Sequence, residues 1–199
     1  HLDASTRRVD IETVGSDHYI NLQHKLLASS GVFTQPTSYL FASWIKMRST
    51  IGFGHSEVNL LDHRSNGTGL KRYGYIVSFS SNVTSNDGTL SVLMGKGDAG
   101  DGWNAYSTNV STWNAGEHYH VAVLQINTKL KVYVNGEKKL DVTTTSIKTN
   151  GERHVSINGL AVVPPISIER YTYMTTIPDL PETFIEQHYN RTDPTIRTT

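Results

Sequence analysis

The 199-residue chain contains no cysteine. This absence excludes disulfide bonds, thiolate metal sites and a cysteine nucleophile together. It does not define the cellular compartment, because a single domain of this length can bury enough apolar surface without disulfides. We expect one domain over residues 1–190, followed by a C-terminal tail over residues 191–199.

The chain also has no excess of charge of either sign, since 18 basic residues balance 18 acidic ones. The basic residues are scattered, so we expect neither a nucleic-acid partner nor a polybasic membrane contact. No apolar run approaches the roughly 18 residues that a membrane-spanning helix needs. Because the sequence opens on His1 without a signal-peptide pattern, we expect a processed product or a piece of a longer protein.

Short apolar runs separated by Gly, Asn, Asp and Ser clusters are what the chain does contain, and they predict an all-β fold. Residues 39–47 are apolar on both faces, which predicts a central strand covered on both sides. Residues 113–134 contain two strand-like runs, and Asn135-Gly136 follows as a strong hairpin signal before a return strand over residues 138–143.

One helix is predicted near the C-terminus, over residues 179–190. Pro181 suits its first turn, and Phe184, Ile185 and His188 fall on one side of it. Residues 95–102 form a glycine-rich acidic loop, and residues 59–72 are expected to form a long polar loop.

The segment from Trp113 to Gly136 resembles the "W-x-H-V-A … L-x-L-Y-V-N-G" core of the concanavalin A-like jelly rolls, in the laminin G-like and pentraxin-like group. Residues 16–20, 40–45, 166–171 and 180–190 are similar to further landmarks of that group, in the same order. The resemblance implies an antiparallel β-sandwich of jelly-roll type with one short C-terminal helix. These landmarks belong to the scaffold, so they do not specify a function.

Glycan-cleaving jelly rolls of this kind carry closely spaced carboxylates on one strand. Retaining hydrolysis needs two carboxyl groups about 5–5.5 Å apart, which alternate strand positions provide. The candidate glutamates of this chain each lack an acid two residues away on the same strand: Glu117, Glu137, Glu152 and Glu169. A glycan hydrolase is therefore the least favoured reading.

The glycine-rich loop is the first candidate site. Asp98 and Asp101 are hard oxygen ligands on a loop that could hold calcium, although a plain turn is the simpler interpretation. Trp103, Asn104 and Tyr106 follow directly and combine an aromatic ring with polar groups, as sugar-binding sites do. The alternative is that Trp103 is a core residue at the start of a strand.

The expected loop over residues 59–72 is the second candidate. It places Asp62, His63, Arg64 and Asn66 near one another, and Arg64 could bind the carboxylate of an acidic sugar through two parallel hydrogen bonds. A solvated loop without a ligand is the simpler interpretation here.

His118 and His120 have the H-x-H spacing of some zinc sites, but no third ligand can be identified. His120 also falls on the histidine of the "W-x-H-V-A" motif, so the resemblance implies a packed scaffold residue. We expect the other seven of the nine histidines at the surface.

The function that these features favour is non-catalytic: a lectin-like or adhesion module that binds a glycan or protein ligand through loops at the rim of the sandwich. The alternative is a structural subunit of a larger particle, such as a viral capsid, spike or fibre. Both imply an extracellular, cell-surface or particle-surface location, which Asn-x-Ser/Thr sequons weakly favour, at Asn66, Asn82, Asn109 and Asn190.

The isolation of the four candidate glutamates generates a first prediction: the isolated chain has no glycosidase activity. Reducing-sugar release from β-glucans and galactans should stay at the level of a buffer blank. Turnover that a single Glu→Gln substitution abolishes would contradict this prediction.

Overall fold

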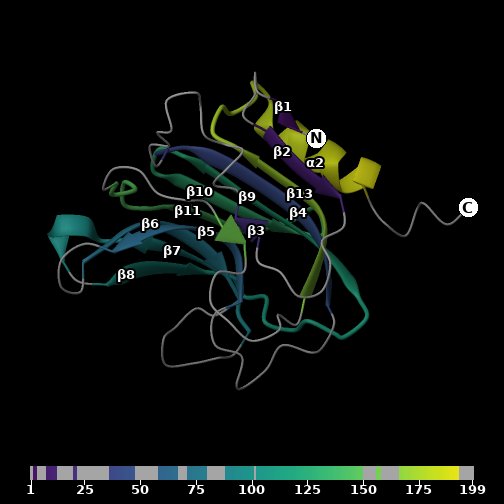
Figure 1. The fold of residues 1–199 in the computed structure, drawn as a ribbon, viewed down its shortest axis with the longest axis horizontal. Coiled ribbons are helices and arrows are strands. Elements are labelled where there is room, and N and C mark those ends of the chain that lie inside the picture. The colour runs from purple at the N-terminus through teal and green to yellow at the C-terminus, as the bar shows by residue number, and fades with distance from the viewer. Residues whose placement is uncertain are drawn as a thin grey trace, which may run out of the picture.

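A computed structural model of the chain describes residues 2–3, 8–12, 20–21, 36–47, 58–66, 71–79, 88–100, 102–149, 156–157 and 166–192. In these residues, thirteen strands form two facing sheets, and every strand pairing is antiparallel. The two layers are visible in Figure 1. The predicted jelly-roll-like β-sandwich is confirmed.

The seven-stranded sheet contains, in order across the sheet, β1 (Leu2–Asp3), β2 (Arg8–Glu12), β13 (Ile166–Met174), β4 (Tyr39–Met47), β9 (His118–Ile126), β10 (Lys129–Val134) and β11 (Glu137–Thr143). The six-stranded sheet contains β3 (Ile20–Asn21), β12 (Ser156–Ile157), β5 (Asn59–Asn66), β6 (Arg72–Ser78), β7 (Ser91–Gly95) and β8 (Trp103–Ser107). The 3₁₀ helix η1 (Gly97–Ala99) lies between β7 and β8, and the helix α2 (Pro181–Thr192) follows β13.

Strand β4 lies at the centre of the seven-stranded sheet and is buried on both faces, as its apolar sequence predicts. Tyr39, Phe41 and Ile45 belong to the main core between the sheets. Leu40 and Ala42 alternate with them and pack in a second cluster that includes apolar residues of α2. A strand with a half-polar pattern could not occupy this position, because both of its faces are removed from water.

The two predicted hairpins on this sheet are also confirmed. Strands β9 and β10 meet at Asn127, and β10 and β11 meet at Asn135 and Gly136. Asn135 and Gly136 have φ angles of 51° and 78°, the left-handed pair that a two-residue type I′ turn requires.

The expected loop over residues 59–72 is wrong, because residues 59–66 form strand β5 within the six-stranded sheet. The polar run Asp62-His63-Arg64 suggested a solvated segment, since it breaks the apolar alternation of a half-buried strand. Asp62 and His63 are nevertheless buried, and each takes part in side-chain hydrogen bonds.

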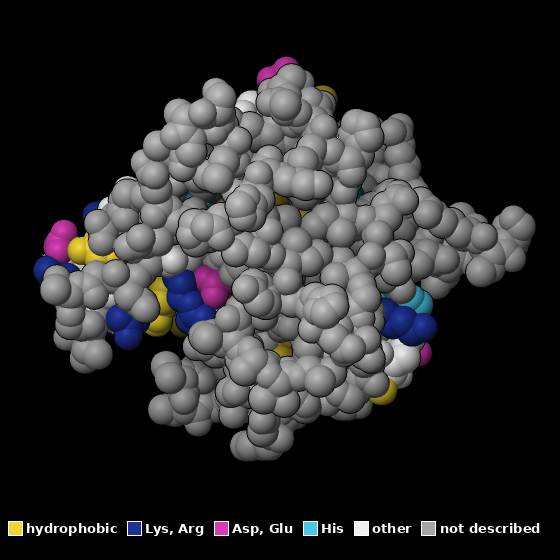
Figure 2. Space-filling view, viewed as in Figure 1, with side chains coloured by type: hydrophobic (Ala, Val, Ile, Leu, Met, Phe, Trp, Pro, Cys, Tyr) yellow, Lys and Arg dark blue, Asp and Glu magenta, His cyan; other side chains and the backbone are white. Residues whose placement is uncertain are grey.

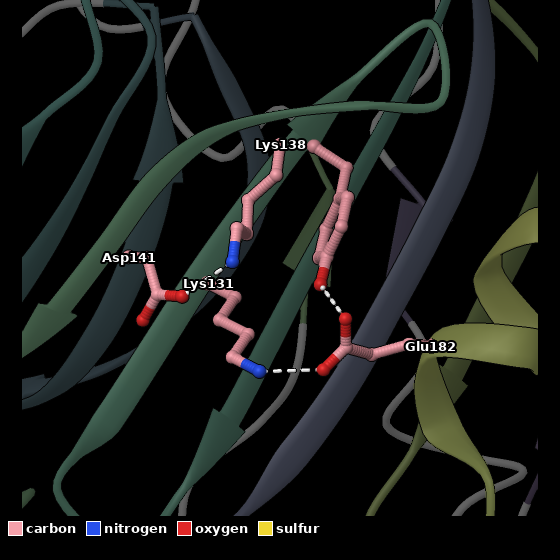
Figure 3. Close-up of polar contacts among 5 residues, drawn as sticks. Lys131, Lys138, Asp141 and Glu182 are labelled. Carbon is pink, nitrogen blue, oxygen red and sulfur yellow. Dashed lines mark hydrogen bonds and ion pairs between the residues drawn. The ribbon is translucent and has the colours of Figure 1, made fainter.

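Helix α2 covers the outer face of the seven-stranded sheet, on the side away from the other sheet (Figure 1). It begins and ends two residues later than predicted, so residues 191 and 192 belong to the helix rather than to the expected tail. At its first turn, Glu182 accepts hydrogen bonds from Lys131 and Tyr133 of β10, at 2.5 and 2.9 Å (Figure 3). Neither helix in the described ranges is long and apolar enough to cross a membrane.

The burial of Trp44 generates a second prediction. Its side chain is 3% exposed beneath α2, where it stacks on Tyr189 with ring centroids 5.6 Å apart. Trp44→Ala should lower the free energy of unfolding by about 3–5 kcal/mol, because it removes buried apolar area and leaves a cavity. Urea unfolding followed by far-UV circular dichroism measures this loss. A urea midpoint equal to that of the parent would contradict the packing described here.

Candidate ligand-binding face

The outer face of the six-stranded sheet carries an acid and a base two residues apart on β5. His63 points into the core, where its Nδ1 lies 3.1 Å from the hydroxyl of Tyr75. Because side chains alternate along a strand, Asp62 and Arg64 point to the opposite, outer face. Their ion pair confirms this placement, with Arg64 Nε 3.0 Å from Asp62 Oδ2.

The guanidinium group of Arg64 is held in one orientation by Asp62. The other carboxylate oxygen, Asp62 Oδ1, accepts a hydrogen bond of 3.1 Å from the backbone N–H of Arg64. Asn59 Nδ2 donates to Asp62 Oδ2 at 3.3 Å, so the carboxylate is itself fixed. A guanidinium group is planar, and its N–H donors match the two oxygens of a carboxylate.

The register of the sheet places Trp103 on the same face as Arg64. Arg64 pairs with Gly74 of β6, and Gly95 of β7 pairs with Trp103 of β8. Asp62, Ile76, Leu93 and Ala105 pair in turn from β5 to β8, so Arg64 and Trp103, each two residues from this row, lie on the same face. The pairing of β6 with β7 ends at Tyr75 and Met94, and the backbone of Arg72 lies over Gly95, so no continuous row of paired residues joins Arg64 to Trp103.

On this outer face, the residues of β6 and β7 that continue the row from Asp62 are apolar. Ile76 pairs with both Asp62 and Leu93, which places an isoleucine and a leucine between β5 and β8 on the outer face. The side chain of Arg64 is 19% exposed, and Trp103 and Leu93 are half-buried. Figure 2 shows basic and acidic groups beside hydrophobic side chains over the region where Figure 1 places β6 to β8.

Asn104 and Tyr106 do not share this face. They project to the other side of β8, where Tyr106 packs against the main core. Asn104 Nδ2 donates to Thr145 Oγ1 at 3.2 Å, and the backbone N–H of Thr145 donates to the Tyr106 hydroxyl at 2.9 Å. Both side chains therefore attach the segment after β11 to the edge strand β8, so their described contacts are structural.

His63 was expected in a surface site, and that expectation is wrong because the side chain is fully buried. Its ring lies against the hydroxyls of Tyr75 and Tyr173, which are 2.5 Å from each other. Burial holds the pKa of Tyr75 well above its ordinary value, so this hydroxyl stays neutral. His188 is also buried, against the expectation of a surface position.

His120 is the packed scaffold residue that the motif implied, since it is fully buried and bonded to His188. The described residues hold no group of three potential metal ligands that would complete a zinc site with His118.

Asp98 is the middle residue of η1 and pairs with Lys71, with Lys71 Nζ 2.7 Å from Asp98 Oδ1. The Tyr73 hydroxyl donates to the same oxygen at 2.9 Å. The hydrogen bond from Lys71, and then that from Tyr73, lower the pKa of the Asp98 carboxyl. Lys71 thus brings a positive charge to the place where we expected calcium. Asp101 lies outside the described residues, so the calcium site stays a prediction.

The sequence pointed to Asp62 together with Arg64 in the expected loop, but their ion pair was not predicted, and Asn59 was not singled out. The signal that could have found the ion pair is the spacing of two residues between Asp62 and Arg64, which puts an acid and a base on the same face of any strand. Reading the segment as a loop removed the reason to apply that spacing.

The family model described as the concanavalin A-like lectin/glucanases superfamily matches residues 14–160. No curated protein matches the chain in sequence. Among solved structures, the CBM40 module of the Ruminococcus gnavus IT-sialidase bound to α2,3-sialyllactose is similar at a TM-score of 0.65 and 14% identity, covering 94% of this chain and all of that one.

Two botulinum neurotoxin structures are also similar in fold. Botulinum neurotoxin type C depends on interaction with two ganglioside molecules for cell entry. Its structure matches at a TM-score of 0.55 and 13% identity, over 81% of this chain and 37% of that one. The binding domain of neurotoxin DC in complex with rat synaptotagmin II matches at a TM-score of 0.58 and 10% identity, over 94% of this chain and 43% of that one. The family match covers most of the chain, which therefore belongs to the concanavalin A-like lectin/glucanase superfamily.

Proposed function

We propose that the chain is a non-catalytic, lectin-like module that binds a glycan on the outer face of its six-stranded sheet. The observation that carries this proposal is the placement of Arg64, oriented by Asp62, on the same face as Trp103. Ligand sites in proteins commonly combine apolar and aromatic surface with a few oriented polar groups, and this face has both.

The chemistry of the face favours an acidic sugar. The terminal nitrogens of a guanidinium group match the two oxygens of a carboxylate. The indole ring of Trp103, on the same face, offers a flat apolar surface to a neighbouring neutral sugar. Solved neighbours bound to sialyllactose or dependent on gangliosides support this ligand class for the fold, although their identities of 13–14% carry over no residue.

The non-catalytic part of the proposal rests on how the acid of this face is used. Asp62 is 7% exposed, and both of its oxygens accept hydrogen bonds or the ion pair within β5. A carboxylate engaged in this way orients a base and is poorly placed to donate a proton to a glycosidic oxygen. An extracellular or surface location follows from the proposed glycan ligand. A protein ligand is the alternative within this proposal, since one toxin neighbour was solved in complex with synaptotagmin II.

The experiment that tests this function is calorimetric titration of the chain with 3′-sialyllactose and with lactose. The parent should bind sialyllactose more tightly than lactose. Arg64→Gln should weaken sialyllactose binding about 10-fold or more, because a charge-assisted hydrogen bond contributes roughly 1.5–3 kcal/mol, and it should leave lactose binding unchanged. Trp103→Ala should weaken both ligands.

Tyr106→Phe is the matched control, because it removes a hydroxyl from the opposite face of β8 and should not change affinity. Thermal melts must show that Arg64→Gln is folded; if it is not, the double variant Asp62→Asn/Arg64→Gln removes the buried unpaired acid. A chelator arm tests the calcium prediction in the same titration. Equal sialyllactose affinities of the parent and a folded Arg64 variant would refute the proposed site.

A further inference from the structure

The outer face of the six-stranded sheet carries a second arginine, Arg72, at the start of β6. In the register of β5 and β6, Arg64 pairs with Gly74, and Arg72 pairs with the residue two positions beyond Arg64. Paired residues share a face of a sheet, and so do alternate residues of one strand. Arg64 and Arg72 are therefore diagonal neighbours on the same face, a relation in which the backbones of a regular ladder lie about 7–8 Å apart.

A close approach of β6 to β7 places Arg72 beside Trp103. Met94 of β7 packs in the main core, so the next residue, Gly95, faces outward. A Cβ atom at Gly95 would collide with the backbone carbonyl of Arg72, so the backbone of Arg72 covers Gly95 on its outer side. Glycine, which has no Cβ, permits this approach. Because Gly95 pairs with Trp103 of β8, the same approach brings Arg72 to the strand pair that carries the indole ring.

The neighbouring residue indicates where the Arg72 side chain points. The Tyr73 ring is buried, and its hydroxyl donates to Asp98 Oδ1 in η1 at 2.9 Å. Successive side chains of a strand point to opposite sides, so the side chain of Arg72 points away from this buried side. It remains half-buried, and its Nη1 donates to the carbonyl oxygen of Lys71 at 3.2 Å. This bond to the backbone restrains the guanidinium group and leaves its charge uncompensated.

The charge of Arg72 distinguishes it from the basic groups near it. Arg64 pairs with Asp62, and Lys71 pairs with Asp98. In the described ranges no acid pairs with Arg72, whose hydrogen bond is to a backbone carbonyl. An anion at Arg64 approaches the carboxylate of Asp62, whereas no described acid opposes an anion at Arg72. The uncompensated positive charge of this part of the face therefore lies at Arg72.

We propose that Arg72 binds a second anionic group of the ligand, so that this face selects glycans with two negative charges. This inference rests on the proposed glycan-binding function and names the ligand class of the same face. A guanidinium group offers N–H donors in a planar fork that fits two oxygens of one anion. Because Arg64 and Arg72 are diagonal neighbours, the two anions belong to the same sugar or to adjacent sugars. A second carboxylate and a sulfate ester both have this chemistry.

Calorimetric titration of the full chain compares one singly charged ligand with two doubly charged ones. The ligands are 3′-sialyllactose, α2,8-disialyllactose and 3′-sialyllactose with a sulfate ester on the galactose. The parent should bind at least one doubly charged ligand about 10-fold or more tightly than 3′-sialyllactose, because a further charge-assisted hydrogen bond adds to the affinity. A gain with disialyllactose identifies a second carboxylate as the anion at Arg72, and a gain with the sulfated ligand identifies a sulfate ester.

Single variants assign the gain to Arg72. The ratio of the affinities for doubly and singly charged ligands should fall to near one in Arg72→Gln, which removes the charge. Arg72→Lys should keep only part of the ratio, because an ammonium group is a point charge without the planar fork. Lys129→Gln is the matched control: it removes one positive charge from β10 of the other sheet, where Lys129 bonds to Thr143, and it should keep the ratio of the parent.

Equal affinities of the parent for all three ligands would overturn this inference and leave the proposed function standing. Binding of none of the three would refute the proposed function itself. A ratio that stays high in a folded Arg72→Gln variant, or that falls equally in Lys129→Gln, would also overturn the inference, because the gain then arises elsewhere or from overall charge. If thermal melts show that Arg72→Gln is unfolded, the Nε–H resonance of Arg72 in the labelled parent decides. It should shift further with a doubly charged ligand than with 3′-sialyllactose, and equal shifts at saturation contradict the inference.

Discussion

The hydrogen bond between His63 and the hydroxyl of Tyr75 determines which face of the six-stranded sheet carries each side chain of β5. A slip of one residue in this strand would place His63 on the surface and bury Arg64. Tyr173 approaches the same ring from the other sheet, so the anchor also ties the two layers together. The ion pair of Arg64 with Asp62 and the placement of Arg64 on the same face as Trp103 both depend on this register.

The two sheets use their outer faces differently. The seven-stranded sheet covers much of its outer face with α2, through apolar contacts at its centre, Glu182 at one end of the helix and the His120–His188 pair at the other. On the outer face of the six-stranded sheet, Arg64, Leu93 and Trp103 are half-buried, whereas Asp62 and Ile76 are buried. The proposed ligand face and α2 therefore lie on opposite outer sides of the sandwich.

Much of the scaffold could be predicted from the sequence because its signals are local. The Asn135-Gly136 turn and the unbroken apolar run of β4 each specify their structure within a few residues. Strand β5 could not be predicted in this way, because Asp62, His63 and Arg64 look like solvated residues until the partners of each are known. Those partners include Tyr75 and Tyr173, 12 and 110 residues from His63 along the chain.

The candidate site could be predicted only in part, because its residues also come from separate strands. Arg64 and Trp103 were both singled out by residue type, but nothing local indicated that they share a face. Tyr106 was grouped with Trp103 although a spacing of three on a strand puts two side chains on opposite faces. The grouping followed from adding Trp103 and Tyr106 to the site on the loop before them, whereas both belong to strand β8, which begins at Trp103.

The most direct measurement of the central claim is an NMR titration of the isotope-labelled chain with 3′-sialyllactose. Binding on the proposed face should shift the amides of β5 and β8 and the Nε–H of Arg64, and leave the amides of α2 unchanged. Shifts confined to other parts of the chain, with the Arg64 Nε–H unaffected at saturating ligand, would contradict the account.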